Sequence, residues 1–240
     1  MNTPRRCYLC GTEMIPIPSG HQGRKLPKHE TRDHVPPDGL FCEPKPSNLI
    51  TVPCCYECNN KHSDADEQFR VLTALQLGTN DAGRKIGVEK VFGSTMKKLR
   101  QPMFFKALAP TIRLAKVATP QGTEEVIYLS TDAAPVVSLV KNMVKGLLYH
   151  FHPEFDYRSQ RFHAEEVTVA KPRPGVSDLG NELRAIIMKY CKEDGRGNHS
   201  EFRFWRQLEL ANQHGAWLLL FYNAVAFIVI HEPSTRPQRA

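Results

Sequence analysis

Two pairs of closely spaced cysteines limit how this chain can fold. Cys7 and Cys10 form one C-x-x-C pair, and Cys55 and Cys58 form the other. Four thiolates in two such pairs complete the tetrahedral ligand set of a structural Zn²⁺ ion and leave no open coordination position. The gap between Cys10 and Cys55 is 44 residues, whereas a zinc ribbon has about 15–20 at this place. We therefore expect zinc to close a long loop that is itself folded.

The remaining cysteines are expected to stay outside this metal site. Cys54 is next to a ligand but lacks the better C-x-x-C spacing, and Cys42 and Cys191 are interpreted as free or buried thiols. The sequence has no run of 18 apolar residues, and no secretory signal is visible at its start. A cytoplasmic location without membrane contact follows as the expectation, and paired cysteines there are more often metal ligands than disulfides.

Charge is unevenly distributed along the chain. The formal net charge is +7 and the isoelectric point is near 9.1, which favours a polyanionic partner. Residues 1–75 are balanced, so the excess comes from the rest, above all from 84–116, where Glu89 is the one acidic residue. This segment is predicted to be helical and is either a nucleic-acid footprint or a solvated helical face. Its basic residues are Arg84, Lys85, Lys90, Lys97, Lys98, Arg100, Lys106, Arg113 and Lys116.

The pattern of apolar residues predicts an α+β fold. Residues 1–63 are rich in Pro, Gly, Cys and His, so this segment needs a metal in place of a hydrophobic core of its own. Two short strands are expected at 31–35 and 49–52, with a turn signal at 36–39 between them, and a helix follows at 63–77.

The second part of the chain is expected to contain both helices and strands. We divide the chain into a module at 1–78, an α+β domain at 79–232 and a disordered tail at 233–240. Helices are predicted at 88–99, 103–115, 131–149 and 178–191, and strands at 124–129, 167–170, 201–210, 217–221 and 225–230. The last two strands form a C-terminal antiparallel hairpin with its turn at Tyr222-Asn223.

Polar residues inside and just after the cysteine frame point to a second site. They are Asp33, His34, Asn48 and Asn59. Asp and Asn oxygens suit Mg²⁺, which keeps several of its waters, and a histidine that titrates near neutral pH suits a general base. Hydrolysis of a phosphodiester needs both a base and a cation. The cluster therefore indicates a metal-dependent nuclease.

The order of these motifs resembles a known family. Cys-x-x-Cys, Asp-His-Val-Pro, Asn-Leu-Ile and Cys-x-x-Cys-Asn-x-Lys follow one another as in the HNH endonucleases of the ββα-metal superfamily. The resemblance covers about residues 7–72. It implies an N-terminal zinc-stabilised ββα-metal module followed by a helical segment and an α+β domain.

The resemblance also implies a role for each polar residue. Asp33 would ligate a catalytic divalent metal, Mg²⁺ or a similar ion, and His34 would be the general base. Asn48 would brace the loop and orient His34. Asn59 would be the second metal ligand, at a position where the family name implies His, and His62, one helical turn on, is the alternative ligand.

The function implied is a DNA endonuclease. Two alternatives stay open, namely a zinc-stabilised nucleic-acid-binding module without cleavage and a nuclease-like subunit or adaptor of a larger complex. A homodimer or a protein partner is compatible with each. Asp64, Asp66 and Glu67 are explained by the positive end of the helix dipole rather than by metal binding. The expected nucleic-acid contacts are Arg32, Lys61, Arg84, Lys85, Lys97, Lys98 and Arg100.

Overall fold

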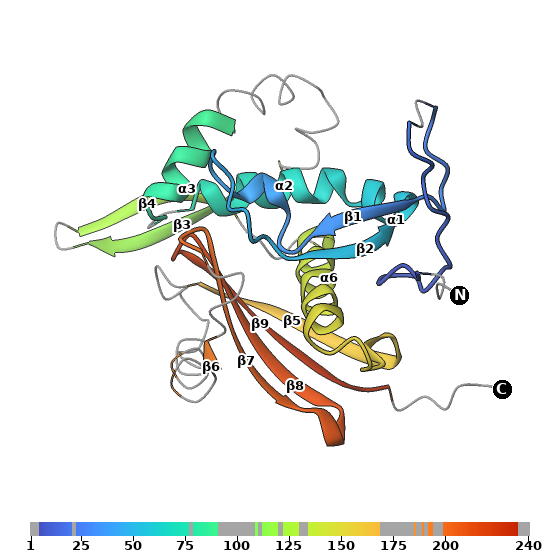
Figure 1. Cartoon of the computed structure of the whole chain (residues 1–240). Helices are drawn as coiled ribbons and strands as arrows, with labels where there is room; N and C mark the ends of the chain where they lie inside the picture. Colours follow the sequence, from blue (N-terminus) through green and yellow to red (C-terminus); the bar gives the residue numbers. More distant parts are fainter. Residues whose placement is uncertain are drawn as a thin grey trace.

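A computed structural model gives the arrangement of the chain (Figure 1). It describes residues 5–20, 23–76, 79–90, 109, 112–119, 122–129, 134–168, 185, 189, 192, 193 and 199–234, with backbone only at 112–119, 122–129, 168, 192 and 193. Within these residues the fold combines α-helices with three antiparallel sheets. The predicted α+β class is confirmed at this level. Most of the helix predicted at 178–191 and most of the tail lie outside the described residues.

The first part of the chain forms a strand pair followed by two helices. The strands are antiparallel, with Asp33 opposite Val52 and His34 opposite Thr51. The first helix follows the second strand without a loop, and His62 separates it from the second helix. The predicted strands and the helix start at Ser63 are confirmed within a few residues. These elements are β1 (Glu30–His34), the 3-10 turn η1 (Asp38–Leu40), β2 (Thr51–Cys55), α1 (Tyr56–Lys61) and α2 (Ser63–Ala74).

The C-terminal part forms a five-stranded antiparallel sheet with the order β5-β9-β8-β7-β6. The predicted hairpin is confirmed, because β8 pairs with β9 across Tyr222 and Asn223, whose φ angles of 50° and 58° suit a tight hairpin turn. The strand predicted at 167–170 begins earlier, at Gln160. The strands are β5 (Gln160–Thr168), β6 (Lys192–Glu193), β7 (Phe202–Glu209), β8 (His214–Phe221) and β9 (Val225–Pro233).

Helix α6 (Ala134–Phe151) joins the two parts. It contacts β2 and α2 on one side and β5 and β9 on the other, between the β1–β2 pair and the large sheet in Figure 1. Alternate residues of β8 point to opposite faces of the sheet, and Trp217, Leu219 and Phe221 face the same core as Val52. One cluster of buried side chains thus includes residues from both parts of the chain, from Cys7 to Val229.

The helical prediction for 84–116 is wrong in its last part. Helix α3 (Asp81–Ile86) is present, but Ile112–Thr119 is a strand, β3, paired antiparallel with β4 (Gly122–Leu129). β3 lies between Pro110 and Pro120, which both disfavour a helix interior. Pairing with β4, which was predicted as a strand, therefore outweighs the helical spacing of apolar residues.

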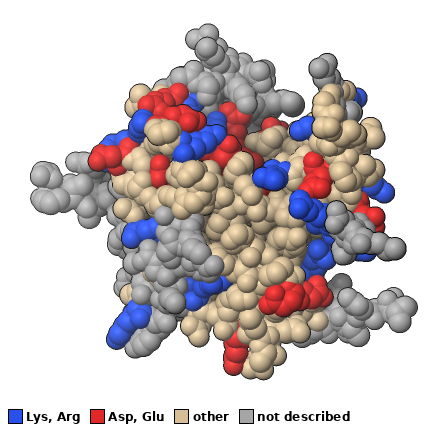
Figure 2. Space-filling model, in the orientation of Figure 1, with Lys and Arg blue, Asp and Glu red and all other residues tan. Residues whose placement is uncertain are grey.

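Neither sign of charge dominates the face drawn in Figure 2, where acidic and basic side chains are interspersed. A continuous basic footprint is therefore not visible among the described residues on this face. In the described part of the chain, no helix is at once long enough and apolar enough to cross a bilayer.

Gly146 sets how closely α6 can approach the end of β1. A Cβ atom at this position would lie 2.6 Å from Cγ2 of Val35 and 3.5 Å from Cε2 of Tyr8. Val35 has a stiff β-branched side chain, so it cannot move away easily. We expect Gly146→Ala to lower the free energy of unfolding by about 1–3 kcal/mol despite the better helix propensity of alanine. Urea unfolding measures this, and Ser138→Ala, at an exposed position of the same helix, is the control. Equal stability of both variants would contradict the close approach.

Candidate functional site

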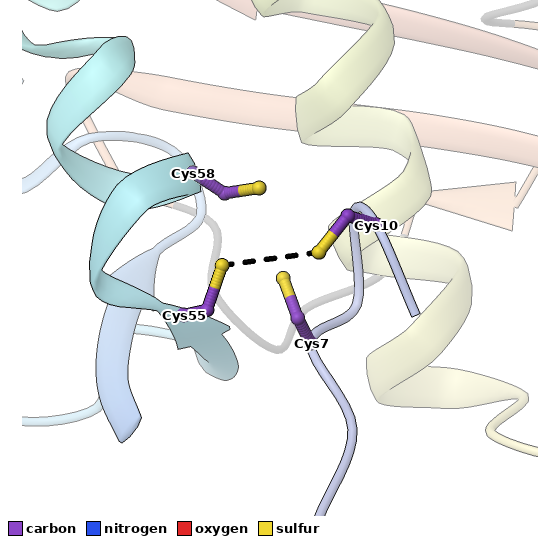
Figure 3. A group of neighbouring side chains, drawn as sticks. All are labelled: Cys7, Cys10, Cys55 and Cys58. Carbon is purple, nitrogen blue, oxygen red and sulfur yellow. Dashed lines mark hydrogen bonds between the residues drawn. The ribbon is translucent and has the colours of Figure 1, made fainter. Parts of the chain in front are cut away.

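The four predicted cysteines converge on one point. Their Sγ atoms all lie within 4.8 Å of one another, and the Cys10 and Cys55 sulfurs are 3.8 Å apart (Figure 3). A zinc ion with four Zn–S bonds of about 2.3 Å has tetrahedral edges of about 3.8 Å. The group therefore has the size of a structural zinc site. Among the described residues it is the one group of three or more His, Cys, Asp or Glu ligands this compact.

The N-terminal cysteine pair is held by a tight turn. The Gly11 N–H donates to the Cys7 carbonyl at 2.9 Å, and Gly11 has a φ of 73°, in the left-handed region that glycine adopts without strain. Cys55 ends β2 and Cys58 lies in α1. Cys54 is outside the group, as predicted, although its sulfur is 3.8 Å from that of Cys7.

A bound cation would relieve the unfavourable electrostatics of this cluster. The hydrogen bond from Cys54 lowers the pKa of Cys7 to about 4, so this thiol ionises first. Burial raises the pKa of Cys55 and Cys58, and the charge of Cys7 raises both further. Four thiolates in such a small volume repel one another, and a bound divalent ion removes that repulsion.

A second site lies beside this cluster, at the end of β1. It is a cavity of about 10 Å³, large enough for one water molecule or one ion. Its apolar wall comes partly from α6. The polar residues that line it are Tyr8, Asp33, His34, His62, Asp66 and Asn142.

Asp33 is the most constrained of these groups. The buried Tyr8 hydroxyl donates to its Oδ2 at 2.7 Å. Burial raises the pKa of Asp33, and the hydrogen bond from Tyr8 and the nearby His34 partly offset this effect. Tyr8 lies in the loop that carries Cys7 and Cys10, so its hydrogen bond to Asp33 connects the cysteine cluster with the cavity.

Asp66 is part of the cavity lining, a position that the sequence interpretation did not predict. Its position in the first turn of α2 suggested a solvated charge at the helix dipole, as for Asp64. Instead it lines the cavity, and burial together with the charges of Asp33 and Asp38 raises its pKa to about 7. Two carboxylates in one small cavity are the oxygen ligands that a hard divalent cation prefers.

His62, the alternative ligand, also lines the cavity. Its Nε2 lies 3.2 Å from the amide nitrogen of Asn142, a residue of α6 that is 8% exposed. Burial lowers the pKa of His62, and the positive charges of Lys61 and Lys145 lower it further. The neutral imidazole is therefore favoured, which is the form that binds a metal.

The two asparagines predicted from the motifs are placed outside the cavity lining. Asn59 donates from Nδ2 to Thr31 Oγ1 and to the Arg32 carbonyl, each at 3.2 Å, so it holds α1 against β1. Thr31 and Asp33 share a face of β1 because side chains alternate along a strand. Asn48 is exposed in the loop before β2, and its role in orienting His34 stays a prediction.

The predicted nucleic-acid contacts are dispersed. Arg32 and Lys61 are exposed, and each is the sequence neighbour of a residue that lines the cavity. Arg84 pairs with Asp81, and Lys85 lies 3.9 Å from Glu89, so both have acidic partners within their own helical segment. Lys97, Lys98 and Arg100 lie outside the described residues.

Three residues of this site had no motif to identify them, namely Tyr8, Asp66 and Asn142. A signal existed for Asn142, because it is a polar residue within the apolar face formed by Leu139 and Met143. The chain matches no known protein family, no curated protein and no solved structure in comparisons with known proteins.

The raised pKa of Asp66 predicts a pH-dependent stability. The ordinary aspartate pKa is near 4 and the value in the folded chain is about 7, so the folded state binds more protons between these values. Stability should therefore fall as the pH rises from 4 to 7. Asp66→Asn removes the buried charge and should raise the free energy of unfolding by about 2–4 kcal/mol at pH 8 without added divalent metal.

Urea unfolding at pH 6 and pH 8 tests this prediction. Asp64→Asn, an exposed change in the same helical turn, is the matched control. Both proteins keep the cysteine cluster, so effects of pH on bound zinc cancel in the comparison. If Asp66→Asn is no more stable than Asp64→Asn at pH 8, Asp66 is not a buried charge.

Proposed function

We propose that this chain is a metal-dependent endonuclease of the HNH type that hydrolyses phosphodiester bonds in DNA. The observation that carries the proposal is the cavity at the end of β1. It contains a histidine, two carboxylates and a second histidine around a volume of one water, directly beside a four-thiol cluster.

The local topology supports the same proposal. β1 and β2 form an antiparallel pair, and α1 follows β2 directly. This is the strand–strand–helix order that the resemblance to the ββα-metal nucleases implies. Asp33 and His34 are the last two residues of β1, and Cys58 and Asn59 lie in the helix, as in the motif order.

His34 is assigned as the general base. It lines the cavity next to Asp33 and would take the proton of the attacking water. Asp33 and Asp66 would hold a divalent cation such as Mg²⁺, which stabilises negative charge on the phosphate. Burial and the negative charge of Asp33 raise the pKa of Asp66, so its ionised form is unfavourable in the free protein. A bound cation would stabilise this ionised form.

The third protein ligand is assigned to His62 or to Asn59. His62 lines the cavity, whereas the Asn59 amide is bonded to the backbone of β1. His62→Ala and Asn59→Ala distinguish them, because loss of a ligand raises the metal concentration needed for half-maximal cleavage more than loss of a packing residue does.

A cleavage assay tests the function. Zinc-loaded full-length protein is incubated with supercoiled plasmid and Mg²⁺ or Mn²⁺, alongside His34→Ala purified in parallel. We expect nicked or linear product that requires the added metal and is lost in the variant. A wild type that retains zinc and binds DNA, but does not cleave with either metal, would overturn the assignment in favour of a binding module.

A further inference from the structure

Helix α6 carries two lysines for which the described residues offer no acidic partner. Lys141 and Lys145 are four residues apart, so they share a helix face, where like charges destabilise the helix. Both are only partly exposed. In the described part of the chain, no carboxylate lies within 4.0 Å of either ammonium group.

The positive charge at Lys145 is unfavourable in its electrostatic environment. Burial lowers its pKa, and the charge of Lys141 lowers it further. Its Nζ lies 5.3 Å from the centre of the Phe162 ring, which compensates the charge only in part. A half-buried ammonium group without a counterion is unfavourable in the free protein, and an anion bound beside it would remove the penalty.

The position of the two lysines relates them to the candidate active site. Asn142, which lies between them, contacts His62, and Leu139 and Met143 of the same helix line the cavity. The charge of Lys145 acts on His62 together with that of Lys61. Acidic groups from β1 and α2 thus line the cavity, and the two lysines of α6 lie on the same helix as Leu139, Asn142 and Met143 without lining it themselves.

The cavity has room for one ion only, so a phosphodiester bound to that ion would lie outside the cavity, where the lysines of α6 could contact it. A cation on Asp33 and Asp66 would contact one phosphate oxygen, and the lysines would contact another or the adjacent phosphate. We propose that Lys141 and Lys145 of α6, with Lys61, bind the backbone phosphates of the nucleic acid, so that α6 holds the substrate next to the site. This inference rests on the proposed function.

Salt-dependent binding tests the inference separately from cleavage. The full-length His34→Ala protein, loaded with zinc, is titrated against a fluorescein-labelled DNA duplex at several salt concentrations. Lys141→Gln/Lys145→Gln in this background is compared with Lys25→Gln/Lys28→Gln, which changes the same charge at two exposed positions of the N-terminal loop.

We expect the α6 variant to bind on the order of tenfold more weakly and the slope of log Kd against log salt to fall by about 2, one for each phosphate that a lysine no longer neutralises. The loop variant should keep the parent slope. Equal slopes in the two double variants would overturn the inference, because the effect would then be one of net charge alone.

The unfolding temperature gives a second measurement, which distinguishes a phosphate-binding lysine from one that is needed for packing. Without DNA, Lys145→Gln should unfold at the same or a higher temperature, because it removes an uncompensated charge. A lower midpoint would make Lys145 a packing residue and would overturn its assignment. Normal lysine-dependent binding together with a wild type that never cleaves would instead refute the proposed nuclease while the phosphate site stands.

Discussion

Removal of zinc is expected to unfold the N-terminal part of this protein and to destabilise the whole chain. Structural zinc sites of four cysteines have apparent binding free energies of about 10–16 kcal/mol at neutral pH, as large as the total stability of a typical domain. The described residues of this region, 5–20 and 23–29, contain no helix or named strand, so a bound metal would add much to the few backbone hydrogen bonds that position them. Cys7 and Tyr8 are nevertheless part of the common core.

The measurement combines metal content with circular dichroism during chelation. Cys58→Ser should lose stoichiometric zinc and the cooperative thermal transition. Cys42→Ser is the control, because the Cys42 thiol is outside the cluster and only donates to the Ala82 carbonyl at 3.5 Å. A protein that stays folded without zinc, or a Cys58→Ser variant that keeps full zinc occupancy, would refute a structural zinc role for the four cysteines.

Replacement of His34 is expected to have the largest effect on activity. General-base catalysis contributes about 10²–10⁴-fold, so His34→Ala should lower the rate constant for plasmid cleavage by that factor. The variant should still bind zinc, because His34 lies at the end of β1 and outside the cysteine cluster. Its affinity for DNA should change little, since the base acts on water rather than on the phosphate.

The control for this prediction is His163→Ala, an exposed histidine of β5 whose Nε2 lies 3.4 Å from Glu232. Single-turnover rates at saturating enzyme separate the chemical step from binding. A His34→Ala protein that cleaves at the wild-type rate would show that another group activates water. His62 is then the next base to test, because it lines the same cavity.

Local sequence signals were sufficient for the cysteine frame and for the elements around it. The C-x-x-C spacing predicted the four clustered cysteines, and two apolar runs separated by a turn at Tyr222-Asn223 predicted the C-terminal hairpin. These features depend on contacts close in sequence or on ligand chemistry. The segment ending at Ala115 was predicted wrongly because its structure depends on pairing with another strand.

The candidate site was only partly predictable for a similar reason. Asp33 and His34 were found by their place in the motif order. Asp66 looks like an ordinary charge at a helix start until α6 packs over it and makes it a wall of the cavity. Asn142 and Lys145 are more than 75 residues from His62 in sequence, and no local pattern relates them to it.

The packing of α6 against the β1–β2 pair has a consequence for synthesis of the protein. The motif residues leave the ribosome early, but α6, which completes the cavity, begins only at Ala134, long after Asn59. A nascent chain that ends before α6 has the zinc ligands but lacks one wall of the cavity. Any hydrolytic activity of this site would therefore arise only after α6 has been translated, which would protect nucleic acids near the ribosome during synthesis.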